Sequence, residues 1–188
     1  MIAKRLAVFF LIMLLLLSCA CGKEKFDPQQ AAAHYSEDRA FTAQYIVTTH
    51  AGFYGEYQLS CRREGGLSTV TVLQPQSIVG ISAVLQDGDI KLQYEDIALD
   101  ALLPEIAGYA PMDMLHGLLA DLRGRVPTHY TLEADCLTLE YRSTQPDGKE
   151  LLKLIFLHPE TLDVLAGECY LEGDLIVALS MESFEWDS

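Results

Sequence analysis

The fold is decided by the segment FTAQYIVTTHAGFYGEYQLSC, residues 41–61. Apolar and polar side chains alternate along residues 41–48, interrupted at Ile46, and the alternation resumes at Tyr57, Leu59 and Cys61 beyond a glycine-containing turn. A period of two places successive side chains on opposite faces of a β-strand. Two such runs around a short turn predict an antiparallel hairpin.

The same pattern extends toward the C-terminus. Turn residues such as Asp87-Gly88 and Pro146-Asp147-Gly148 separate further alternating or β-branched runs about every ten residues, which is typical of an antiparallel all-β body. Strands are predicted over residues 67–73, 80–85, 90–94, 130–134, 137–141, 151–157, 164–171 and 175–184. We therefore expect a mainly β fold of about 10–11 strands with two or three helices.

Two segments have helical character. Asp27 and Pro28 are an N-cap acid and a proline at the first helical position, so a helix is expected over residues 29–39. Pro111 is expected to open a second helix that ends at Arg123-Gly124. Its apolar residues at helical spacing are Met112, Leu115, Leu119 and Leu122.

Residues 99–110 precede this second helix and are predicted to form a loop with unusually high apolar content. Two interpretations remain open: the loop and helix pack onto the sheet as core, or they form a lid over a cavity that accepts an acyl chain. The candidate lid and cavity residues are Leu102, Leu103, Ile106, Met112, Leu115, Leu119 and Leu122.

The N-terminus has the pattern of a secretory signal peptide. Lys4 and Arg5 precede twelve consecutive apolar residues, 6–17, and the small residue Ser18 follows. Twelve helical residues rise about 18 Å, which is too short for a bilayer core of roughly 30 Å.

Leu16-Leu17-Ser18-Cys19 resembles the lipobox of bacterial lipoproteins, in which the cysteine receives a diacylglyceryl group. Cys19 fits this pattern better than Cys21, which lacks an aliphatic residue three positions earlier. We expect a signal peptide at 1–18, a short tether at 19–26 and a single domain at 27–188. The resulting protein would be extracytoplasmic and lipid-anchored to the membrane; an ordinary secreted protein cleaved nearby is the alternative.

The charge of the chain limits its possible partners, and its cysteines limit its possible disulfide bonds. The chain has a formal net charge of −14, and residues 19–188 carry 11 basic and 27 acidic residues. Such a surface repels phosphate backbones, so nucleic acid is not expected as a partner. Cys61, Cys136 and Cys169 are too few and too scattered for a disulfide framework, and either one bridge or free buried thiols are possible.

Catalytic and metal-binding patterns are missing from the sequence. The five histidines show no metal-ligand spacing, and acid pairs such as Glu95-Asp96 fall in or beside predicted turns. We expect no enzyme activity, no cofactor and no metal. Arg62 and Arg63 form a basic spot that is either a solvated strand end or a docking contact for a protein or an anionic headgroup.

Residues 72–81 and 87–95 resemble the central passage of the LolA/LolB-like lipoprotein-localisation superfamily. A strand ending at Pro75 is followed there by a hairpin with an Asp-Gly turn and the Leu-x-Tyr strand at Leu92-Gln93-Tyr94. The resemblance implies a strongly curved antiparallel half-barrel with helices over its concave face. It also implies binding of a hydrophobic ligand, a lipid or acyl chain, or of a lipidated protein.

In more detail, the chain resembles clostridial-type lipoproteins, including the germination-specific lipoprotein of spore formers. That resemblance implies an alternative function as a non-catalytic partner of a cell-wall (cortex) amidase during sporulation or germination.

Overall fold

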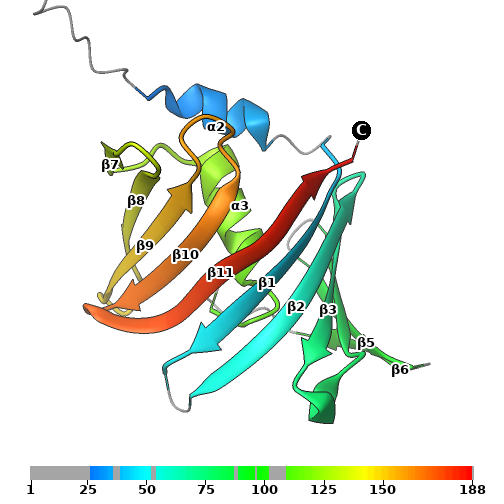
Figure 1. Ribbon diagram of the computed structural model, residues 1–188. Helices are drawn as coiled ribbons and strands as arrows, with labels where there is room; N and C mark the ends of the chain where they lie inside the picture. Colours follow the sequence, from blue (N-terminus) through cyan, green and yellow to red (C-terminus); the bar gives the residue numbers. More distant parts are fainter. Residues whose placement is uncertain are drawn as a thin grey trace, which may run out of the picture.

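The computed structural model describes residues 26–35, 39–51, 54–86, 89–95, 97–101 and 109–187 (Figure 1). These residues form one eleven-stranded antiparallel sheet, two α-helices and a short 3-10 helix, η1. The strands are β1 (Phe41–Thr49), β2 (Gly55–Glu64), β3 (Leu67–Gln74), β4 (Ser82–Gln86), β5 (Asp89–Tyr94), β6 (Ile97–Ala101), β7 (His129–Leu132), β8 (Leu137–Thr144), β9 (Glu150–Leu157), β10 (Val164–Leu171) and β11 (Asp174–Trp186). The helices are α2 (Pro28–His34), η1 (Gln76–Ile78) and α3 (Met114–Gly124).

The sheet consists of two meanders joined at its centre. The strand order is β6-β5-β4-β3-β2-β1-β11-β10-β9-β8-β7, so neighbours in the sheet are neighbours in the chain except at the β1–β11 pair. The sheet curls strongly, and α3 lies within the curl (Figure 1). The prediction of a mainly β, curved antiparallel sheet of about 10–11 strands with helices is confirmed.

The concave face of the sheet carries the core. Phe41, Ala43, Tyr45 and Val47 are buried on β1 while the residues between them are more exposed, as a period of two requires. The same alternation runs through β2, β3, β8 and β9.

Helix α3 packs closely against the second half of the sheet. Leu115, Leu118, Leu119 and Leu122 are all buried. A methyl group at Gly167 of β10 would collide with the Leu118 side chain, so the absence of a side chain there permits the close approach.

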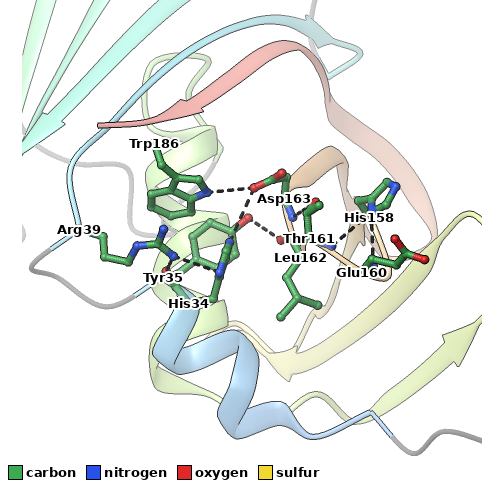
Figure 2. Close-up of polar contacts among 9 residues, drawn as sticks. All are labelled: His34, Tyr35, Arg39, His158, Glu160, Thr161, Leu162, Asp163 and Trp186. Atoms are coloured by element: carbon green, nitrogen blue, oxygen red, sulfur yellow. Dashed lines mark hydrogen bonds and ion pairs between the residues drawn. The ribbon is translucent and has the colours of Figure 1, made fainter. Parts of the chain in front are cut away.

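Helix α2 is tied to the last strand and to the turn between β9 and β10 (Figure 2). The Tyr35 hydroxyl donates to the carbonyl of Leu162 at 2.7 Å, and the indole Nε1 of Trp186 donates to Asp163 at 3.0 Å. The Arg39 guanidinium lies over the Trp186 ring, 3.7 Å from its centroid. These contacts hold the first helix of the domain against the end of the chain.

The predicted helix boundaries need correction. Asp27 caps α2 by accepting from the Gln29 amide, but the helix ends at His34 and not at residue 39. Pro111 lies in a turn, and α3 begins three residues later at Met114. The apolar spacing located the helical face, but it did not fix where backbone hydrogen bonding begins.

Three strand predictions also differ from the structure. The second strand does not end at Cys61, because β2 continues through Arg62 and Arg63 to Glu64. Residues 97–101, within or beside the predicted apolar loop, form β6 and pair with β5. The strand predicted at 130–134 is shifted by one or two residues, to His129–Leu132.

Candidate functional site

An apolar cavity of about 320 Å³ lies between the concave face of the first meander and the turn that leads into α3. Strands β2 to β5 with the segment at η1 form one wall, and residues 110–113 form the other. The lining residues are Tyr57, Val72, Ile78, Ile81, Ala83, Ile90, Leu92, Ala110, Pro111, Met112 and Asp113.

The local sequence explains why space remains here. Ala83 of β4 pairs with Val70 and Leu92 on the neighbouring strands, and it contributes only a methyl group to the lining of the cavity. Ile78 and Ile81 enter from η1 and the residues after it, where Pro75 has ended β3. The sheet therefore supplies apolar side chains on a curved surface that α3 does not cover.

The candidate lid residues separate into three groups. Met112 lines the cavity. Leu115, Leu119 and Leu122 are buried in the core between α3 and the sheet and are not among the described lining residues. Leu102, Leu103 and Ile106 lie outside the described residues, as does the predicted lipid attachment site Cys19.

Most of the lining residues were not singled out from the sequence. Val72, Ala83, Ile90 and Leu92 occupy alternate positions on one face of three consecutive predicted strands. The period of two marked that face as buried, but a buried wall and a packed core give the same pattern.

Arg62 and Arg63 do not form one surface spot, and that part of the prediction is wrong. Successive residues of a strand point to opposite faces. Arg62 is exposed and pairs with Glu64 at 3.2 Å, whereas Arg63 is only 2% exposed on the concave face. The Arg63 Nη1 donates to the Ser68 hydroxyl at 3.5 Å, and its buried Nε has no partner in the structure.

Two further buried polar side chains are Tyr45 of β1 and His116 in the first turn of α3. The hydroxyl of Tyr45 and the Nδ1 of His116 are buried and have no hydrogen-bond partner among the described residues. Burial raises the pKa of Tyr45 well above its ordinary value, with the charge of Cys61 and then Asp113 acting in the same direction. Burial also lowers the pKa of His116, so its imidazole favours the neutral form.

The three cysteines of the described residues, Cys61, Cys136 and Cys169, are free thiols. Cys61 and Cys169 are buried, and burial raises the pKa of Cys61 to about 12 and that of Cys169 to about 11. A thiol that stays protonated at neutral pH is a poor nucleophile.

The described ranges contain no group of His, Cys, Asp and Glu side chains placed to hold a metal ion. None of the helices in the described part of the chain is both long and apolar enough to cross a membrane.

No protein-family model matches the sequence, and no curated protein matches it either. The fold is similar to that of a LolA superfamily protein from Nitrosomonas europaea, at 11% identity over 87% of this chain and 95% of that chain, with a TM-score of 0.47. It is also similar to the Mycobacterium tuberculosis lipoprotein LppX, at 10% identity over 84% of this chain and 93% of that chain, with a TM-score of 0.43.

A third similar structure is the MucA/MucB complex from Pseudomonas aeruginosa, at 13% identity and a TM-score of 0.46. The match covers 86% of this chain but 56% of that chain. At these identities the likeness concerns the fold alone.

Proposed function

We propose that this protein is a non-catalytic lipoprotein, anchored at the membrane surface, whose domain binds a hydrophobic ligand. The observation that carries the proposal is the apolar cavity of about 320 Å³ between β2–β5 and residues 110–113. Small-molecule sites are typically concave, mostly apolar and about 300–1,000 Å³ in volume.

The size and lining of the cavity suit a single flexible chain. Its volume lies at the lower end of the range for ligand sites, and most of its lining side chains are aliphatic. Burial of each methylene of an acyl chain contributes about 0.8 kcal/mol. One acyl chain, whether of a free lipid or of a lipidated protein, fits this space better than a bulky polar ligand.

The proposed anchor is Cys19, within the Leu16-Leu17-Ser18-Cys19 motif. Two acyl chains hold a protein on a membrane stably, whereas one gives only marginal binding. A net charge of −14 for the whole chain disfavours attachment through anionic headgroups, so the lipid would do the attaching. The domain would then meet its ligand outside the cytoplasm at a membrane face.

Ligand uptake by the purified domain, residues 26–188, tests the proposal. A neutral naphthylamine dye, weakly fluorescent in water, should brighten on addition of the protein and be displaced by an added fatty acid. Native mass spectrometry should show the fatty acid bound at one copy per chain. A protein that neither brightens the dye nor retains any lipid would contradict the proposal.

A second candidate function is that of a protein partner for a cell-wall amidase in sporulation or germination. The specific observation in its favour is the edge strand β7, where Tyr130 and Leu132 are exposed, and Val126 just before it, which is 76% exposed. Edge strands with exposed apolar side chains can pair with another chain. Co-elution of the domain with a purified cortex amidase, lost in the variant Leu132→Lys, would support this role. Unchanged separate elution would count against it.

A further inference from the structure

Arg63 is a buried arginine whose hydrogen-bonding capacity is largely unused. Arg63 is 2% exposed, and its Nη1 donates a hydrogen bond to the Ser68 hydroxyl at 3.5 Å. Its Nε is buried without an acceptor. Among the described residues, no carboxylate lies within ion-pair distance of its guanidinium.

A buried cation in this state is energetically unfavourable. Buried polar groups in folded proteins are normally hydrogen-bonded, and buried charges are normally paired. Lys153, the other buried cation of the described core, follows the rule, since its ammonium group lies 2.8 Å from the Asp121 carboxylate. Arg63 departs from the rule, since no described residue supplies an anionic partner for it.

Arg63 belongs to the same concave layer as the cavity wall. Its cross-strand partner on β3 is Ser68, Ser68 pairs with Leu85 of β4, and Leu85 pairs with the lining residue Ile90. From the helix side, the positive charge of Arg63 acts on His116, which lies one turn after the lining residue Asp113. Arg63 is therefore not itself a lining residue, but it lies in the cross-strand row that ends at the lining residue Ile90.

We propose that Arg63, with the Ser68 hydroxyl beside it, binds the anionic head of the ligand, a carboxylate or a phosphate, while the acyl tail occupies the cavity. This inference rests on the proposed function and specifies its ligand as an anionic amphiphile. The planar guanidinium donates to two oxygens of such a head at once. In the described part of the chain, the Tyr45 hydroxyl and the His116 Nδ1 are further buried polar atoms without a hydrogen-bond partner.

The test compares three probes with the same acyl tail: dodecanoate, dodecyl phosphate and dodecanol. Each displaces the neutral dye from the domain, residues 26–188. We expect at least one of the two anions to bind on the order of tenfold more tightly than the alcohol, because hydrogen bonds to a charged group are the strong ones. The anion that binds more tightly identifies the head as a carboxylate or a phosphate. This comparison uses the wild-type protein and needs no variant.

Variants then locate the anion site. Arg63→Met should weaken binding of the preferred anion on the order of tenfold and leave dodecanol binding unchanged. Arg63→Lys should retain part of the preference for the anion. Arg62→Met, on the exposed face of the same strand, should bind all three probes like the wild type.

The outcomes separate this inference from the proposed function. Equal affinity of the wild type for the alcohol and both anions would overturn the anion site and leave the apolar cavity intact. A preference for the anion that survives in a folded Arg63→Met variant would also overturn it. Failure of all three probes, alcohol included, would instead count against ligand binding in the cavity.

Discussion

The Lys153 ammonium of β9 donates to the Asp121 carboxylate of α3 at 2.8 Å, and both side chains are less than one-tenth exposed. Arg125 donates to the other oxygen of the same carboxylate at 2.8 Å. This interaction fixes the C-terminal half of α3 against the second meander. The ion pair and the close packing at Leu118 both hold α3 against the second meander.

Removing one partner of this pair should be strongly destabilising. Asp121→Leu leaves the Lys153 ammonium buried without a carboxylate, and breaking a buried pair in this way costs about 3–5 kcal/mol of unfolding free energy. The double variant Asp121→Leu with Lys153→Leu should recover much of that loss. Urea unfolding monitored by circular dichroism measures both changes.

The matched control for this prediction is the exposed pair Asp147–Lys149, where the atoms lie 2.6 Å apart but both side chains are more than half exposed. Asp147→Asn should change the urea midpoint little, because solvent screens exposed pairs. Equal effects at the two pairs would contradict the importance given to burial.

Gly167→Ala should loosen the contact between α3 and β10. The added methyl group meets the Leu118 side chain, which is itself fully buried, and overpacking of this kind costs about 1–3 kcal/mol. Gly124→Ala, where nothing lies near the position of the new methyl group, is the control and should be neutral or stabilising. Thermal unfolding of the two alanine variants gives the comparison, and a loss of stability at Gly124 alone would contradict it.

Ala83→Phe should block the cavity without unfolding the domain. The residue is buried and lines the cavity, so a phenyl ring would extend into the space that the ligand needs. We expect dye affinity to fall on the order of tenfold while the melting temperature changes little, since the ring fills existing space. Val84→Phe, on the opposite face of the same strand, should bind dye like the wild type. Unchanged dye binding in Ala83→Phe would place the dye elsewhere.

Stability should fall as the pH drops below about 6.5, in part because of His116. Burial lowers the pKa of its imidazole below 6.5; Asp113 raises it, and Arg123 and Arg63 lower it further. The unfolded chain therefore binds the proton more readily, and the stabilisation present above pH 6.5 is lost as the pH falls.

The melting temperature measured between about pH 7.5 and about pH 5 should therefore depend less on pH in His116→Gln than in the wild type. His129→Gln, at an exposed position on β7, is the control. Because burial also lowers the pKa of His34, part of the slope should remain in His116→Gln. An unaltered slope would show that His116 does not contribute.

The alternation of apolar residues predicted the sheet well, because every second residue of a strand lies on the same face. The strand at Val164–Leu171 has the predicted bounds, and Phe41–Thr49 differs by one residue. Helix termini were predicted less well, since Pro111 lies in a turn and α3 begins at Met114. A proline is compatible with a first helical turn but does not require one.

The cavity could be predicted in kind but not in position. A residue that lines a cavity and a residue packed in the core follow the same apolar spacing in the sequence. Leu115 and Met112 therefore looked alike, although Leu115 lies in the core and Met112 lines the cavity. Arg63 is a residue for which the sequence pattern suggested exposure, whereas the structure buries it. A strand that continues past Cys61 turns Arg63 inward, but the basic Arg62-Arg63 pair resembles a strand end.

The central β1–β11 pair has a consequence for how the chain is made. During synthesis β1 emerges early, but its partner, residues 174–186, is the last strand to appear. At about 5–20 residues per second, the interval lasts on the order of ten seconds. Until then one edge of the first meander is open to pairing with other chains. The sheet can close only after its last strand has been synthesised, so the chain completes its fold as a whole and not progressively from its N-terminus.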